Sequence, residues 1–208
     1  MRHQTVTAIA MTAAVFTGAS GAVAQPVPTP HDVLLDTEAG VIILDLDYEH
    51  APVTACHFAH YVMWGDYHHG SFFRSVVAAT NGNPHPIDVI QAATPRGADD
   101  ALRPPIPLER TSDTGLSHVA GAVSMARDGP DTATTSFFIV TQDTPSLDYG
   151  GGRKADGQGF GAFGRVVVGL DVARTIQARP TDGREQRTPP VRINAAVMLT
   201  PAPASGSA

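Results

Sequence analysis

The sequence predicts a mainly β domain, a closed antiparallel barrel with two helices, from three observations. Short apolar runs recur along the chain, Gly-rich turns separate them, and only two segments have the spacing of an amphipathic helix. Strands and helices do not alternate, so the βαβ rhythm of a parallel sheet is missing. Closing an antiparallel sheet removes its exposed edges, and two helices can then cover the ends of the barrel.

The first three elements follow one another closely. Two strands are expected at residues 33–35 and 41–46, joined by a tight turn that ends in glycine. A helix then begins at Pro52, because proline lacks the N–H that a helix start leaves unbonded. The helix ends at Gly65, and its apolar stripe includes Cys56, which we expect to pack as a small core residue.

Six further strand-like runs and a second helix complete the domain. β-Branched and aromatic residues dominate the runs, as is typical of strands. The helix is expected over residues 169–179, where apolar residues recur at helical spacing. The strands are expected over residues 72–77, 87–90, 122–125, 137–141, 163–168 and 191–200.

Both ends of the chain differ in composition from the domain between them. Residues 1–24 contain one arginine, an apolar run without acids and an Ala-x-Ala site, which together are typical of a cleavable secretory signal peptide. A membrane anchor is the alternative, but the run is short for a span of about 20 apolar residues. We expect a flexible lead-in over 25–31, the folded domain over 32–200 and a disordered tail over 201–208. The mature protein is then periplasmic or secreted, without membrane attachment.

Composition narrows the classes of partner. The formal net charge of the 208 residues is −6 and no basic run is present, which argues against binding to nucleic acid. Cys56 is the only cysteine, so an internal disulfide is impossible and packing must stabilise the domain. A domain of this size can bury a core of its own, and we expect a monomer.

Three other site types find little support in the sequence. His57 and His60 lie one helical turn apart and His68 and His69 follow, but a metal site needs a further ligand with carboxylate support, so we expect no metal and no cofactor. The Gly-rich segment 150–161 lacks the Lys-Ser/Thr pair of a phosphate-binding loop and is expected to form a long mobile loop. No G-x-S-x-G elbow supports Ser-His-Asp chemistry.

Four segments, taken in order, resemble the cyclophilin family of peptidyl-prolyl cis-trans isomerases. They are "TEAGVIILDLDYEHAPVTACHFAHYVMWGDYHHGSFFRSV", "VIQAA", "GAVSMARDGPDTATTSFFIV" and "LDYGGGRKADGQGFGAFGRVVVGLDVARTI". The similarity spans about residues 33–200, and the Gly-rich insert resembles exported bacterial members. The resemblance implies an eight-stranded antiparallel barrel capped by two helices. It also implies a proline-binding groove, with proline-containing peptides and unfolded exported proteins as partners.

The resemblance implies that Arg74 is the catalytic residue. Its guanidinium would donate to the prolyl nitrogen or the neighbouring carbonyl and stabilise the rotated amide over the planar one. Gln91 would orient Arg74, and Ala126 and Arg127 would supply the strand along which the peptide lies. Phe138 would form the floor of the pocket, with Val89 and Leu147 as walls. The implied peptide-binding set comprises Phe73, Val89, Gln91, Ala126, Arg127, Ser136, Phe138, Leu147 and Phe160.

Three departures from the family pattern affect four positions. Ser136 stands where the family usually has glutamine, and its side chain is too short to reach a peptide carbonyl across the groove. Ala92 and Ala93 replace two glycines and would be strained if either required positive φ. Ser146 stands where many members have tryptophan, which argues against tight cyclosporin binding. The favoured interpretation is a weakened but active isomerase that assists the folding of exported proteins. The alternative is a cyclophilin-like peptide-binding module or chaperone.

Overall fold

The computed structural model describes residues 31–97 and 102–199. The expected signal peptide and tail, and the lead-in except its last residue, lie outside the described residues. Within the described ranges, no helix combines the length and the hydropathy that a membrane span requires.

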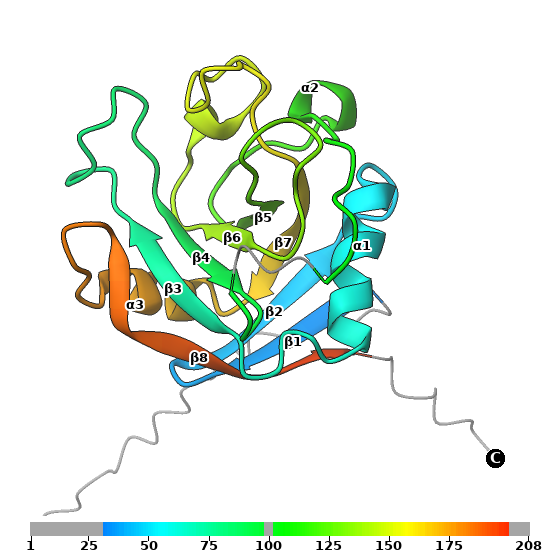
Figure 1. Cartoon of the computed structure of the whole chain (residues 1–208), viewed down its shortest axis with the longest axis vertical. Coiled ribbons are helices and arrows are strands. Elements are labelled where there is room, and N and C mark those ends of the chain that lie inside the picture. The colour runs from blue at the N-terminus through cyan, green and yellow to red at the C-terminus, as the bar shows by residue number, and fades with distance from the viewer. Residues whose placement is uncertain (1–30, 98–101, 200–208) are drawn as a thin grey trace, which may run out of the picture.

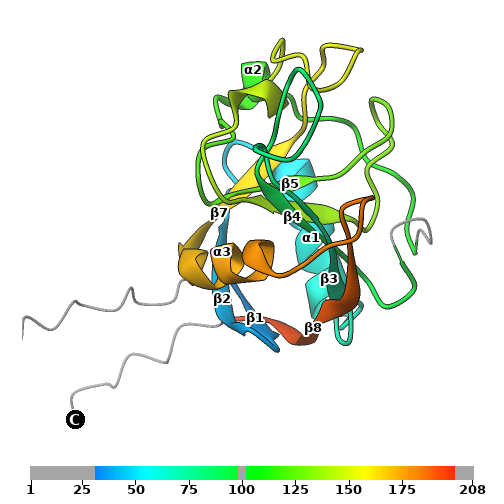
Figure 2. The ribbon, with the colours of Figure 1, turned by 90° about the vertical axis from the view of Figure 1, so that its left-hand side faces the viewer.

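Eight strands close into one barrel in which all neighbours are antiparallel (Figures 1 and 2). Around the barrel they follow the order β1-β2-β7-β5-β6-β4-β3-β8. The predicted fold class is therefore confirmed. The strands are β1 (Asp32–Thr37), β2 (Gly40–Leu46), β3 (Ser71–Val76), β4 (Val89–Ala93), β5 (Ala122–Met125), β6 (Phe137–Val140), β7 (Ala162–Val168) and β8 (Gln186–Met198).

Two helices lie on opposite sides of the barrel, α1 (Pro52–Met63) and α3 (Leu170–Ala178) (Figures 1 and 2). Phe58 of α1 and Ile176 of α3 belong to the same buried cluster that fills the barrel, so each helix caps the core from its side. Two single-turn elements, α2 (Thr111–Thr114) and the 3₁₀ helix η1 (Pro145–Leu147), were not predicted, because one turn is too short to produce a periodic pattern.

Helix α1 buries only part of the apolar stripe that the sequence predicted, namely Phe58, Tyr61 and Val62. Cys56 is exposed, so the prediction of a packed cysteine was wrong, and Trp64 just after the helix is 77% exposed. Two polar residues face inward instead. Thr54 bonds the Glu109 carboxylate, and His57 bonds the Thr134 carbonyl. Buried polar side chains are tolerated when they are hydrogen-bonded, and hydropathy does not reveal such partners.

Two strand boundaries also differ from the prediction. β4 covers residues 89–93 rather than 87–90, because the Ile87 side chain packs into a cluster although its backbone precedes the ladder. β8 begins at Gln186, five residues before the expected start. Pro189 and Pro190 concealed that start, since proline cannot donate to a ladder and usually argues against a strand.

Alternation along β4 and β6 creates two separate apolar clusters. Ile90 and Phe137 point into the barrel and join the large inner cluster, whereas their neighbours Val89 and Phe138 point outward. The outward residues form a second cluster, called here the outer cluster: Val76, Ile87, Val89, Ala122, Phe138, Val140, Leu147 and Phe160. The sheet therefore has apolar residues on both faces at this point, and the outer face carries the site described next.

Candidate active site

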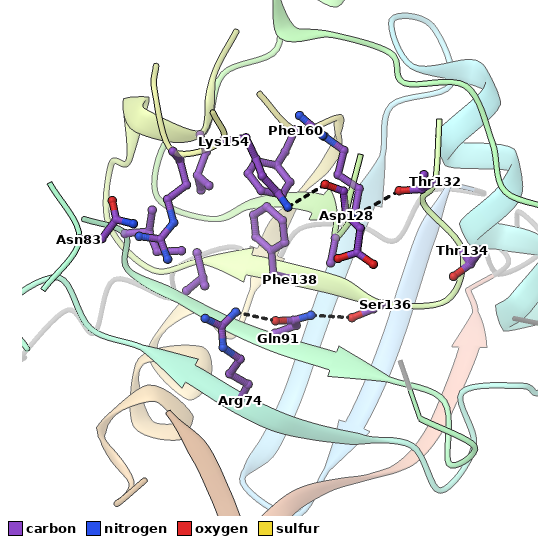
Figure 3. Close-up of a pocket in the computed structure, with 16 residues that line it drawn as sticks. Arg74, Asn83, Gln91, Asp128, Thr132, Thr134, Ser136, Phe138, Lys154 and Phe160 are labelled. Carbon is purple, nitrogen blue, oxygen red and sulfur yellow. Dashed lines mark hydrogen bonds between the residues drawn. The ribbon is translucent and has the colours of Figure 1, made fainter. Parts of the chain in front are cut away.

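A cavity of about 440 Å³ lies on the outer face of the barrel, above the outer cluster (Figure 3). Such a volume suits a small ligand or a short peptide segment. Nine of the ten residues that the sequence predicted for the site line it: Arg74, Val89, Gln91, Ala126, Arg127, Ser136, Phe138, Leu147 and Phe160. The other lining residues were not predicted: Asn83, Ile87, Asp128, Thr132, Thr134, Arg153 and Lys154.

Strand register aligns the key side chains in one row across four strands. Arg74 of β3 lies opposite Gln91 of β4, and Gln91 lies opposite Phe138 of β6. Phe138 in turn lies opposite Ser124 of β5. Residues opposite one another in an antiparallel pair share a face, so these residues share the outer face. The fold itself thus brings an arginine beside an aromatic floor.

A β-bulge in β3 turns Arg74 outward. The register with both β4 and β8 shifts between Phe72 and Arg74, and against β4 this leaves Phe73 as the extra residue. Phe72 is buried in the inner cluster, and simple alternation would then point Arg74 inward as well. The bulge reverses that parity. It also explains why Phe73 does not line the pocket, where the sequence placed it.

A directional chain of hydrogen bonds fixes one side of the guanidinium (Figure 3). Arg74 Nη1 donates to Gln91 Oε1 at 3.1 Å, and Gln91 Nε2 donates to Ser136 Oγ at 2.9 Å. Ser136 Oγ then donates to the Ala92 carbonyl at 3.1 Å. Gln91 orients Arg74, as predicted. Ser136 has a role that the sequence did not suggest, because its hydroxyl accepts the hydrogen bond that fixes the side-chain amide of Gln91.

A carboxylate fixes the other side of Arg74. Arg74 Nη2 donates to Glu185 Oε2 at 2.5 Å, and Asn81 Nδ2 donates to Glu185 Oε1 at 2.5 Å. Glu185 has φ of 64°, a left-handed conformation that is unfavourable for a residue other than glycine. The sequence did not suggest this partner, which lies 111 residues from Arg74. A guanidinium has five N–H groups, so both bonds leave donors for a ligand.

The apolar half of the pocket is built around Phe138. Its ring meets the ring of Phe160 edge-on, with 5.4 Å between centroids. On another side, His118 stacks on Phe138 at 6.0 Å with nearly parallel planes. Such ring pairs add to the stability gained from burial alone. The floor that a proline ring would contact is therefore held from two directions.

His118 also takes part in a buried Ser-His-Asp row. His118 Nδ1 lies 2.6 Å from an oxygen of Asp148, and His118 Nε2 lies 3.0 Å from Ser124 Oγ. The order of groups is that of a hydrolase triad. However, Ser124 is fully buried and has no access to the pocket. The hydrogen bonds between Ser124, His118 and Asp148 therefore hold His118 against the Phe138 ring and supply no nucleophile.

The predicted backbone strand for the peptide is only partly present. β5 ends at Met125, and the Ala126 N–H already donates to the Ser136 carbonyl at 2.8 Å. The Arg127 side chain is buried rather than presented to a ligand. It donates to both carboxylate oxygens of Asp156 at 2.7 and 2.9 Å, and its Nε donates to the Gly159 carbonyl.

The ion pair between Arg127 and Asp156 anchors the Gly-rich insert beside the pocket. Hydrogen bonds from Arg127 lower the pKa of Asp156 to about 2, so the anchoring pair is ionised at any ordinary pH. Arg153, Lys154 and Phe160 of the insert line the cavity. The insert thus forms one wall of the pocket.

The expectation about the two alanines in β4 has a clear outcome. Ala92 and Ala93 lie in β4 with extended backbone, and the non-glycine residues with positive φ in the described chain are His69, Asp131 and Glu185. The strain considered for Ala92 and Ala93 does not arise.

Within residues 31–97 and 102–199, no group of three or more potential ligands gathers to hold a metal ion.

Comparison with known proteins identifies the family. The model of the family "cyclophilin type peptidyl-prolyl cis-trans isomerase/CLD" matches residues 32–198. The chain is 36% identical over 178 residues to peptidyl-prolyl cis-trans isomerase A of Dickeya dadantii, covering 82% of this chain and 86% of that one. This chain belongs to the cyclophilin family. It is a peptidyl-prolyl cis-trans isomerase by class, as the resemblance implied.

Further cyclophilins support the assignment. Peptidyl-prolyl cis-trans isomerase ppi1 of Schizosaccharomyces pombe is 35% identical over 173 residues, covering 81% of this chain and 99% of its own length. A crystal structure of a Cryptosporidium parvum cyclophilin, determined in the presence of the dipeptide Ala-Pro, superposes with a TM-score of 0.66. That likeness, at 19% identity over 81% of this chain and 99% of the other, shows the shared fold.

Proposed function

We propose that this cyclophilin isomerises X-Pro bonds in exported proteins and that Arg74 stabilises the twisted amide. The observation that carries the proposal is the placement of Arg74, held by Gln91 and Glu185 beside the apolar floor of Phe138. A proline ring on that floor would bring its own peptide bond alongside the guanidinium.

The chemistry follows from the electronic structure of the amide. Resonance gives rotation about the C–N bond a barrier of about 18–20 kcal/mol. Rotation breaks the resonance and leaves a lone pair on the prolyl nitrogen. An N–H of Arg74 that donates to this nitrogen, or to the neighbouring carbonyl, binds the twisted state more strongly than the planar one. Only such differential binding accelerates the reaction.

The magnitude of the Arg74 contribution can be bounded. A hydrogen bond to a charged group contributes about 1.5–3 kcal/mol, and about 1.4 kcal/mol changes a rate tenfold. Arg74 would thus supply one to two powers of ten. Gln91 and Glu185 increase its effect, because a donor already in position costs no reorganisation when the amide twists.

The proposed site of action is the periplasm or the extracellular medium. It rests on the signal-like composition of residues 1–24, which lie outside the described residues. Expression with periplasmic fractionation, followed by intact-mass measurement, tests it. We expect the mature chain to begin at Gln25. Full-length protein retained in the cytoplasm would contradict export.

NMR exchange spectroscopy on an Ala-Pro-Phe peptide tests the proposed mechanism. We expect the parent to give cis–trans exchange peaks and Arg74→Ala to lower the exchange rate by one to two powers of ten. Arg165→Ala is the matched control, since Arg165 is exposed on β7 and pairs with Asp45 outside the pocket. Urea titration of each variant would establish that the fold is retained.

One observation favours the alternative of a peptide-binding module, namely Ser136 in place of the usual glutamine. Ser136 directs its hydroxyl to the Ala92 carbonyl and so lends no donor to a peptide. If the parent binds the peptide without accelerating exchange, the alternative holds. Ser136→Gln would then be expected to restore turnover.

A further inference from the structure

The pocket carries an excess of positive charge although the chain as a whole is acidic. Four cationic side chains line it, whereas the formal net charge of the protein is −6. Two of the four are neutralised by carboxylates. Arg74 pairs with Glu185, and Arg127 pairs with Asp156.

The other two cations, Arg153 and Lys154, donate only to neutral oxygens. Arg153 Nη1 donates to Asn81 Oδ1 and to the His85 carbonyl, each at 3.1 Å. Lys154 Nζ donates to the Asp128 carbonyl at 2.9 Å. Among the described residues no carboxylate lies within 4.0 Å of either cationic group. Both are half-buried, so each keeps a charge at the pocket wall without a carboxylate in direct contact, although Glu185 acts on Arg153 and Asp156 on Lys154 at longer range.

Lys154 reaches across the pocket from the insert to the opposite wall. Figure 3 shows its amino group above the ring of Phe138, bonded to the backbone at Asp128. The carboxylate of Asp128 points away from that bond, toward Thr134 (Figure 3). A segment that entered the pocket over Phe138 would therefore meet the ammonium group of Lys154 directly.

Arg153 is linked to the catalytic arginine through a shared polar network. Asn81 accepts from Arg153 and donates to Glu185, the partner of Arg74. Burial, and then the nearby charge of Arg74, lower the pKa of Arg153, whereas the charge of Glu185 opposes this shift. Glu185 thus already offsets part of the repulsion between the two guanidinium groups, and an anion in direct contact with Arg153 would offset more of it.

We propose that Arg153 and Lys154 select substrates with an acidic side chain close to the isomerised proline. The inference rests on the proposed function and specifies its substrate class. Ion pairs at partly exposed sites each contribute about 0.2–1 kcal/mol, and a tenfold preference corresponds to about 1.4 kcal/mol. Two such pairs would therefore give about a two- to thirtyfold preference, expressed mainly in KM, since neither group is placed on the twisting amide.

The test compares matched peptides that differ only in charge. Glu or Gln is placed at each of the two positions before and after Ala-Pro, and kcat/KM for isomerisation is measured at low salt. We expect the parent to prefer Glu over Gln about two- to thirtyfold at one of these positions at least. The preference should fall toward one in Arg153→Gln/Lys154→Gln, and with 0.5 M NaCl in the parent. Arg165→Gln, which removes an exposed cation outside the pocket, should keep the parent preference.

The outcomes separate this inference from the proposed function. Equal rates on Glu and Gln peptides in the parent, or a preference that survives the double substitution, would overturn the selection of acidic substrates while isomerisation stands. If no peptide is turned over, the proposed function fails. Calorimetric titration of the same peptides then decides the inference, because the Glu peptides must still bind more tightly than the Gln peptides for it to hold.

Discussion

The inner and outer apolar clusters are built by the same strands but differ in what covers them. The inner cluster is enclosed by the barrel and capped by α1 and α3, so its aromatic rings pack mainly against one another, apart from Tyr61, whose ring also contacts Arg103 and His57. The outer cluster is covered by the loops after β5 and β6 and lies beneath the pocket. Phe137 and Phe138 are adjacent in the chain, yet one belongs to each cluster.

Because the two faces of β6 are covered differently, residues on its inner face contribute mainly to stability and those on its outer face mainly to the site. Residues on the inner face can be exchanged only at the cost of a cavity in a closed core. Residues on the outer face already adjoin an open volume, and polar groups accompany them, namely Arg74, Gln91 and Ser136. We therefore expect inner substitutions to change the free energy of unfolding and outer ones to change peptide handling.

The largest expected effect is the loss of stability in Phe137→Ala. The Phe137 ring lies 5.0 Å from Phe58, 5.3 Å from Tyr67 and 6.0 Å from Phe72, measured between centroids. Truncating such a ring costs about 3–5 kcal/mol. Urea denaturation followed by circular dichroism measures this change. A loss below 1 kcal/mol would contradict the assignment of Phe137 to a closed core.

Phe138→Ala should produce a smaller loss of stability and a loss of peptide binding. Phe138 supplies the pocket floor and is itself buried, so what binding removes from water is the proline ring of the ligand, at about 0.8 kcal/mol for each CH₂ group. We expect the Kd for an Ala-Pro peptide to rise about tenfold, as measured by calorimetry. The comparison would fail if Phe138→Ala unfolded as readily as Phe137→Ala while binding the peptide normally.

Within the outer site, Gln91→Met should lower turnover by about two- to tenfold. The substitution keeps the length of the side chain but removes the acceptor for Arg74 and the donor to Ser136, and a net hydrogen bond contributes about 0.5–1.5 kcal/mol. Peptide exchange by NMR measures the rate. Gln142→Met, at an exposed position outside the pocket, should leave it unchanged. Equal rates for both variants would show that Arg74 does not depend on Gln91.

The smallest expected effect is a pH dependence from His57, which lies on the buried face of α1. Burial lowers the pKa of His57 below 6.5, although its bond to the Thr134 carbonyl opposes the shift. As the pH falls through 6.5, the unfolded chain therefore binds a proton that the folded chain refuses, and the free energy of unfolding decreases. Urea midpoints at pH 7.5 and 5 should differ less in His57→Gln than in the parent. His60→Gln, exposed on the same helix, should change the slope less than His57→Gln does, because His60 acts on the pKa of His57 only through its charge.

The sequence predicted most of the barrel because apolar runs and glycine turns report burial directly. Its errors arise where position depends on partners distant in the chain. Thr54 and His57 point inward because Glu109 and Thr134 satisfy them, and no local pattern encodes that. Consequently the buried face of α1 was predicted only in part: Phe58, Tyr61 and Val62 are buried, whereas Cys56 was wrongly placed inside.

The site was predicted largely through the family resemblance, and its misses have a physical basis. A single-residue bulge reverses the direction of Arg74 and excludes Phe73, and alternation in a sequence cannot show a bulge. Glu185 joins Arg74 from the turn before β8, so only the folded chain reveals the pair. Arg153 and Lys154 lie in the Gly-rich insert, where composition predicted a loop and no charge pattern.

Titration of ¹⁵N-labelled protein with an Ala-Pro peptide tests the central claim most directly, namely that the outer face binds the substrate. The structure has a second cavity, lined in part by Tyr48, Leu116 and Val166, which provides an internal comparison. We predict that the amide shifts change around Gln91, Phe138 and the insert, and remain constant at the second cavity. Changes confined to the second cavity would contradict the assignment of catalysis to the outer cluster.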